Sequence, residues 1–205
     1  MDRTPTKNSP KLMEAVIQEM QLSLGESLAW LNHVFGLAER TSRDYNDNRQ
    51  YYDKRQGIHE PWRETETSPS VYVGNGKYEQ ITPDSRDWGN YAFFYLDERQ
   101  DLSSWSRVMP YFEIEGDVNL VVWGDLRDIE SEDDRNLESV KSQVLQALGE
   151  MRLTSGRVGW SRVYEGKEVF DDFTNKDYLG LNTMWPYFAF RFEGEIRCNS
   201  GCVGS

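Results

Sequence analysis

The chain has 205 residues, of which 13% are aromatic and 28% are charged, and its formal net charge is −12. Unfolded chains are poor in aromatic residues, so this composition predicts a folded domain with a substantial core. The excess of acidic residues argues against sequence-independent binding of nucleic acid on a basic face, and no apolar run is long enough to predict a membrane-spanning helix.

Residues 1–11 are polar, contain two prolines and lack the apolar segment of a secretory leader, so we expect an N-terminal arm. A helix is expected next, with Ser9 as its N-cap and Pro10 at its first position. We expect a break near Gly25, followed by more helix or a packed turn through Leu37. The helix is indicated by apolar residues that recur at spacings of three and four: Leu12, Met13, Val16, Ile17, Met20 and Leu24.

Residues 38–70 are rich in charged and polar side chains, and we expect a long loop that is mobile or ordered by a partner. The segment 71–81 predicts a hairpin whose turn is Gly74-Asn75-Gly76, because these residue types adopt the positive φ angles of tight turns. Further elements are predicted by hydrophobic periodicity: strands at 90–96, 111–114 and 118–123, a helix at 136–151, and strands at 157–164 and 186–197.

The last strand shows the strongest alternation in the chain. We expect it to bury only one of its faces. One face holds Tyr187, Ala189, Arg191, Glu193 and Glu195, and the other holds Phe188, Phe190, Phe192 and Ile196.

This order of elements predicts a single α+β domain over residues 12–196, in which two main helices flank a mostly antiparallel sheet. Residues 197–205 are expected to form a C-terminal tail.

Chemistry-bearing motifs are few. The two histidines, His33 and His59, fall on different expected elements, and His33 is expected to be a packed or surface residue of a helix. The sequence matches no catalytic, phosphate-binding or zinc motif, so we expect no catalytic residue, cofactor or metal. Cys198 and Cys202 are expected to be free thiols, and a local disulfide or half of a metal site are the alternatives.

An acidic segment lies between the strand at 118–123 and the second helix. It has three open interpretations: a structural role, which for Asp133 and Asp134 is to complement the helix dipole; contact with a partner; or a metal site, although the calcium-loop pattern is absent. Tryptophans in loops are further interface candidates. The candidate interface residues are therefore Asp125, Asp128, Glu130, Glu132, Asp133, Asp134, Trp62, Trp88 and Trp105.

Five segments together resemble a family of small proteins from phages and prophages of Bacteroidetes. They are residues 27–36 (SLAWLNHVFG), 71–78 (VYVGNGKY), 89–94 (GNYAFF), 118–123 (VNLVVW) and 186–195 (PYFAFRFEGE). The order of elements is also similar to that of tail-terminator and tail-completion proteins, which form rings between capsid and tail.

The resemblance implies a non-enzymatic virion protein of the head–tail connector or neck. Such a protein is assembled in the host bacterial cytoplasm as a homo-oligomeric ring. It contacts the portal or connector proteins on one side and the tail on the other, with its arms gripping adjacent rings. DNA would pass through an acidic lumen without specific binding, and no membrane is involved.

Two other functions remain open. An acidic inhibitor that mimics DNA is the main alternative, although 23 Lys and Arg interrupt the acidic surface. An enzyme with a carboxylate-only site, which leaves no short motif, is the other.

Overall fold

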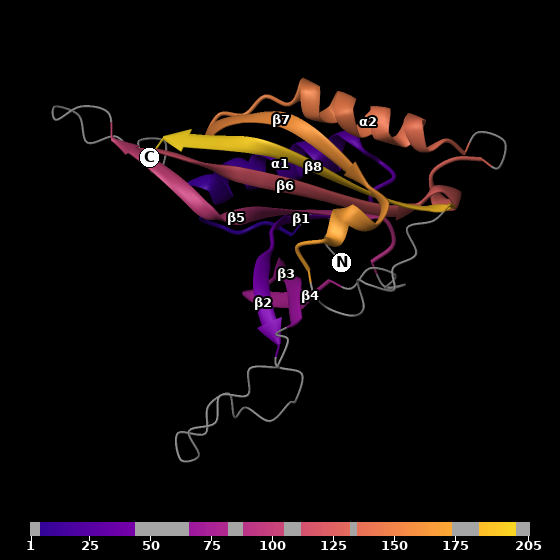
Figure 1. Cartoon of the computed structure of the whole chain (residues 1–205), viewed down its shortest axis with the longest axis horizontal. Helices are drawn as coiled ribbons and strands as arrows, with labels where there is room; N and C mark the ends of the chain where they lie inside the picture. Colours follow the sequence, from indigo (N-terminus) through magenta and orange to yellow (C-terminus); the bar gives the residue numbers. More distant parts are fainter. Residues whose placement is uncertain are drawn as a thin grey trace, which may run out of the picture.

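The computed structural model describes residues 5–43, 66–81, 88–104, 112–131, 135–173 and 185–199. Its largest element is a five-stranded sheet in the order β1-β5-β6-β8-β7 (Figure 1). β1 pairs in parallel with β5, and the other neighbours are antiparallel. The strands are β1 (His33–Leu37), β5 (Tyr91–Ser104), β6 (Phe112–Asp125), β7 (Gly156–Glu165) and β8 (Tyr187–Asn199).

A smaller antiparallel sheet extends from this body in the order β2-β3-β4 (Figure 1). Its strands are β2 (Glu39–Arg43), β3 (Glu66–Gly74) and β4 (Lys77–Gln80). The turn of the predicted hairpin is confirmed, since Gly74, Asn75 and Gly76 all have positive φ angles.

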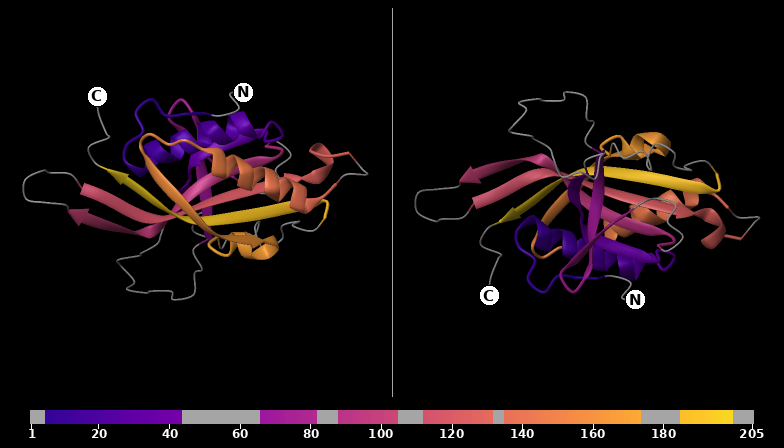
Figure 2. Two further views of the ribbon diagram at one scale, coloured as in Figure 1. Left: turned by 90° about the horizontal axis from the view of Figure 1, so that it is seen from above. Right: turned by 90° about the horizontal axis from the view of Figure 1, so that it is seen from below.

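The helices α1 (Met13–Ser27) and α2 (Leu137–Glu150) both pack on one face of the large sheet (Figure 2). The other face is covered by the 3-10 segment η2 (Gly166–Phe170) together with residues of the small sheet. A second 3-10 segment, η1 (Leu126–Asp128), follows β6. The predicted α+β class, with a mostly antiparallel sheet and two helices, is confirmed.

The first helix differs from the prediction at both ends. It begins at Met13, after Leu12 with a φ of 54°, and has no side-chain cap, so Ser9 and Pro10 precede it. It continues through Gly25 to Ser27, so the break expected near Gly25 is wrong. A packed turn follows, with Leu28 and Leu31 buried, which is one of the two expected alternatives, but residues 33–37 form β1. The reason is tertiary: Val34 packs in the core on the helix side of the sheet and Phe35 in the core on the other side, which requires the alternation of a strand. His33 is therefore a strand residue.

β8 shows the predicted alternation, but the expectation of a single buried face is wrong. Phe188, Phe190 and Phe192 face the helices, as their apolar character requires. On the other face Ala189 and Arg191 are also buried, because η2 packs there. β8 runs to Asn199, so the predicted tail from residue 197 begins inside the sheet.

Two other boundaries need correction. The strands predicted at 111–114 and 118–123 are one strand, β6, because Gly116 continues the ladder by pairing with Gln100 and Ile196. The predicted loop at 38–70 contributes β2 and most of β3, while residues 44–65 lie outside the described part. No described helix has the length and apolar character needed to cross a membrane.

Candidate interaction surfaces

The acidic segment begins with an ion pair that stabilises its own turn. Asp125 accepts a hydrogen bond from the backbone N–H of Arg127 at 2.9 Å, and its two carboxylate oxygens lie 2.9 Å from Arg127 Nε. Arg127 also donates to the Tyr187 hydroxyl at 2.8 Å, with its guanidinium 5.1 Å from the centroid of that ring. Partial burial alone would raise the pKa of Asp125, but the hydrogen bonds and charge of Arg127 lower it below its ordinary value. Asp125 therefore has a structural role.

Glu130 has a structural role as well. It accepts a hydrogen bond from the backbone N–H of Asn136 at 2.7 Å, and Asn136 in turn caps α2 by accepting from Glu138 N at 2.9 Å. Asp128 is exposed. The described residues do not include Glu132, Asp133 and Asp134, so the expected contact of Asp133 and Asp134 with the helix dipole stays a prediction.

Of the three candidate tryptophans, Trp88 is described, while Trp62 and Trp105 lie outside the described ranges. Trp88 packs edge-on against His33 and Phe35, with ring centroids 5.3 Å and 5.2 Å away, and the His33 and Phe35 rings stack at 5.6 Å. This aromatic cluster borders an open groove of about 810 Å³ between the N-terminal arm, β1 and the β3–β4 turn. Trp88 thus combines a packing role with a place on a concave surface.

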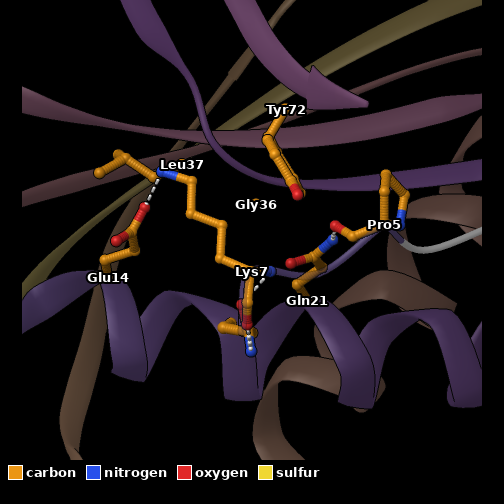
Figure 3. A pocket seen from close by; sticks show the side chains of 8 residues that line it. Pro5, Lys7, Glu14, Gln21, Gly36, Leu37 and Tyr72 are labelled. Atoms are coloured by element: carbon orange, nitrogen blue, oxygen red, sulfur yellow. Dashed lines mark hydrogen bonds and ion pairs between the residues drawn. The ribbon is translucent and has the colours of Figure 1, made fainter. Parts of the chain in front are cut away.

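The described part of the N-terminal arm folds back onto its own chain (Figure 3). The Gln18 side chain accepts from Lys7 N at 2.9 Å and donates to Lys7 O at 3.1 Å, and Gln21 donates to Pro5 O at 2.9 Å. The Lys7 ammonium pairs with Glu14 and lies 5.2 Å from the centroid of the Tyr78 ring. Burial alone would lower the pKa of Lys7, but its contacts with Glu14 and Tyr78 raise it. These contacts hold the small sheet, the arm and α1 together.

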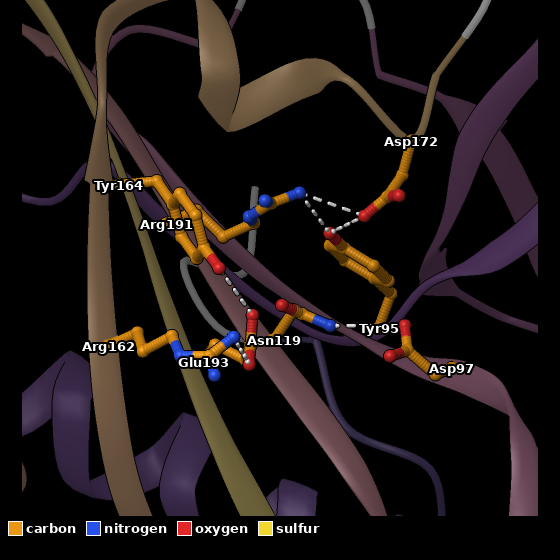
Figure 4. A network of polar contacts seen from close by, with 8 residues as sticks. All are labelled: Tyr95, Asp97, Asn119, Arg162, Tyr164, Asp172, Arg191 and Glu193. Carbon is orange, nitrogen blue, oxygen red and sulfur yellow. Dashed lines mark hydrogen bonds and ion pairs between the residues drawn. The ribbon is translucent and has the colours of Figure 1, made fainter.

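A polar network occupies the face of the large sheet opposite the helices (Figure 4). Arg191, which is buried, donates to Asp172 at 2.9 Å and to the Tyr95 hydroxyl at 3.3 Å, and the Tyr95 hydroxyl donates to Asp172 at 2.5 Å. The Arg191 guanidinium lies 4.2 Å from the centroid of the Tyr164 ring, and the Tyr164 hydroxyl donates to Glu193 at 3.0 Å.

Burial, and secondly the hydrogen bond to Asp172, raise the pKa of Tyr95 well above its ordinary value. Its hydroxyl therefore stays protonated near neutral pH and acts as a fixed donor. The network attaches the segment after η2 to β5 and β8, which is a structural function.

Among the described residues, Leu102 and Trp185 are the most exposed of the large apolar side chains, and they lie at opposite ends of the sheet. Leu102 is 65% exposed and lies on the β5–β6 hairpin, which extends past the helices (Figures 1 and 2). Trp185 is 67% exposed and directly precedes β8 at the other end. Sequence reasoning selected neither residue. Their signals were weak: Leu102 is an isolated apolar residue in a polar stretch, and Trp185 stands just outside the alternating strand.

Among the residues that the structure describes, no three His, Cys, Asp or Glu side chains are grouped closely enough to hold a metal ion. Cys198 is buried, and Cys202 lies outside the described residues. No model of a known protein family matches the sequence, and no curated protein matches it either. Candidate functions therefore depend on the surfaces described above.

Proposed function

We propose that this chain is a non-enzymatic ring subunit of a phage head–tail connector or neck, similar to a tail terminator or tail-completion protein. In this role it joins the portal side of the capsid to the tail. The observation that carries the proposal is the β5–β6 hairpin, which projects beyond the helices and exposes Leu102, while Trp185 is exposed at the opposite end of the same sheet. Trp is one of the residue types enriched in protein interfaces, which makes Trp185 the stronger candidate contact of the two.

Two separate exposed ends on one chain fit a contact that pairs unlike ends. Such a contact repeats from subunit to subunit and closes into a ring when the rotation allows it, whereas a two-fold axis pairs the same two ends reciprocally in a dimer. The proposed ring is the first of these arrangements.

The charge of the chain is consistent with a DNA passage. A net charge of −12 repels phosphate groups, so a ring with an acidic lumen would let DNA move through without binding it. On this proposal the ring has no sequence-specific contact with nucleic acid, and its partners are copies of itself and the neighbouring virion proteins.

The alternative of a DNA mimic is less well supported by the acidic side chains. A mimic needs free carboxylates over a whole face, whereas Asp125 and Glu130 hold local turns. Asp172 and Glu193 likewise belong to the polar network on the sheet. An enzymatic role has less support still. Tyr95, whose pKa is strongly raised, stays protonated and donates a hydrogen bond to Asp172 in a structural contact.

The proposal is tested by the mass of the purified protein in solution and by its presence in virions. We expect size-exclusion chromatography with light scattering to give a multimer, electron microscopy to show closed rings, and mass spectrometry to find the chain in purified phage particles. A protein that is monomeric at every concentration and missing from virions would contradict the proposal. Recovery of a host nucleic-acid-binding protein in a pull-down would favour the mimic.

A further inference from the structure

We infer that copies of this chain are linked by exchange of a short N-terminal segment, which leaves its own body and binds the same site on a second copy. The segment is residues 5–8, named here the arm segment. The surface of α1, β1 and the small sheet on which it lies is named the arm site (Figure 3). The inference rests on the proposed function, because it supplies a link between the copies of the ring.

The arm site binds the backbone of an extended peptide. The Gln18 side chain accepts from Lys7 N at 2.9 Å and donates to Lys7 O at 3.1 Å, so it pairs with both backbone polar groups of that residue, as a neighbouring strand would. Gln21, which is 1% exposed, donates to the carbonyls of Pro5 and Val34, both at 2.9 Å. An empty site would take one of these bonds from a buried amide, which is unfavourable. The site is therefore more stable with a peptide bound.

The arm site also selects side chains, and this identifies the partner. Pro5 is buried, and two positions later the Lys7 ammonium pairs with Glu14 and lies 5.2 Å from the centroid of the Tyr78 ring. The sequence has seven prolines, and only Pro5 is followed two positions later by a lysine. A second copy carries an identical arm segment that can make the same contacts, so a second copy is the partner that fits this site.

The arm segment and α1 run in opposite directions. Pro5 contacts Gln21, whereas Lys7 contacts Gln18, which is nearer the start of the helix. The chain therefore reverses over residues 9–12 before it enters α1. Three of these four linking residues are exposed, so the linker can open without uncovering the core.

The reversal is strained at Leu12, the last residue before α1. Its φ of 54° and ψ of −129° form a combination that glycine adopts and other residues avoid. The Leu12 side chain is 38% exposed, so little burial offsets this strain. When the arm segment binds a second copy, its contacts are reproduced there and the linker no longer has to reverse. Strain in a short linker is the condition that favours exchange of a segment between copies.

The first test changes the backbone freedom of Leu12 in the full chain. Leu12→Gly removes the strain of the closed form, so it should stabilise the monomer and weaken self-association by roughly tenfold. Leu12→Ala is the matched control, because it truncates the same side chain but keeps the Cβ that causes the strain. Sedimentation should show wild-type association for Leu12→Ala. Equal association of the two variants would contradict the inference.

The second test uses the contact between Lys7 and Glu14 in the unmodified protein. A carbodiimide joins an amine to a carboxylate that touches it, without a spacer. Isotope-labelled and unlabelled chains are unfolded together in urea, refolded at a concentration at which the multimer forms, and cross-linked. Mass spectrometry should find Lys7 of a labelled chain joined to Glu14 of an unlabelled chain, and the reverse. In dilute monomer the same link should form within single chains.

The outcomes separate this inference from the proposed function. Links confined to single chains within the multimer overturn the exchange and leave a ring subunit in place. A dimer with mixed links supports the exchange and contradicts the ring, whereas a larger closed multimer with mixed links supports both. A wild-type protein that is monomeric at every concentration overturns both.

Discussion

At the residue scale, Glu19 is the most heavily bonded carboxylate of α1. Its oxygens accept from the backbone N–H and hydroxyl of Thr154, both at 2.6 Å, and from the Ser155 hydroxyl at 2.5 Å. These bonds join α1 to the start of β7, and nothing in the local sequence around Glu19 predicts them. Partial burial alone would raise the pKa of Glu19, but these hydrogen bonds lower it below its ordinary value.

A lowered pKa in the folded state makes stability depend on acid pH. The contribution of Glu19 should be fully present above the ordinary pKa of 4.5 and should be lost as pH falls from there through the lower folded-state value. We expect Glu19→Gln to cost about 1–2 kcal/mol at neutral pH, since bonds to a charged acceptor are lost and the site is partly exposed. Urea unfolding at neutral and at acid pH measures both. A variant with the same loss at every pH would contradict this role.

Tyr95 gives a second prediction at this scale. Tyr95→Phe removes a buried hydroxyl that donates to Asp172 and accepts from Arg191, and it keeps the ring packed on Phe173 at 5.3 Å between centroids. We expect a loss of about 1 kcal/mol of unfolding free energy. Tyr72→Phe is the control for the loss of a hydroxyl, since the Tyr72 hydroxyl accepts an exposed hydrogen bond of 3.4 Å from Gly76 N. Equal stability of the two variants would show that the network contributes nothing.

At the element scale, β7 lies at the edge of the large sheet and depends on a close approach to β8. A Cβ added at Gly194 would lie 2.7 Å from the carbonyl oxygen of Gly159 and 2.9 Å from the Trp160 ring. The strand pairing leaves no room there, so Gly194→Ala should destabilise the protein by about 1–3 kcal/mol.

Gly149 provides the matched control within α2. A Cβ there meets nothing within 4 Å, and a helical glycine costs conformational entropy, so Gly149→Ala should stabilise by about 0.5–1 kcal/mol. Thermal unfolding of the two variants should shift in opposite directions. A neutral Gly194→Ala variant would mean that β7 moves away from β8 without cost.

At the scale of the whole molecule, the net charge of −12 opposes any contact between copies. If the subunit contact is apolar, added salt screens the repulsion between copies and should strengthen the multimer. Sedimentation at increasing ionic strength measures this effect. Dissociation of the multimer by salt would instead identify an interface held by opposite charges.

The elements with strong local sequence signals could be predicted, whereas the contacts between those elements could not. The apolar stripe of α1, the alternation of β8 and the Gly-Asn-Gly turn were read correctly because each depends on neighbouring residues. Residues 33–37 were misassigned because an apolar run without clear alternation fits a buried helix or a buried strand equally well. Their pairing with β5, about sixty residues away, decides between the two.

The candidate surfaces divide in the same way. Asp125 and Glu130 were selected for their charge, but their hydrogen bonds to Arg127 and Asn136 assign them to local turns. Leu102 and Trp185 stand out only once the sheet is assembled, because exposure depends on what packs over a residue.

The sequence by itself determined the composition of the core, the two helices, the hairpin turn and the alternation of the last strand, since these arise from short-range periodicity and backbone preference. Tertiary structure alone decided that both faces of β8 are buried, that Arg191 lies in a network with Tyr95 and Asp172, and that Leu102 and Trp185 are exposed at opposite ends. The physical reason is that burial and pairing depend on residues distant in the chain, and their contacts override the local pattern.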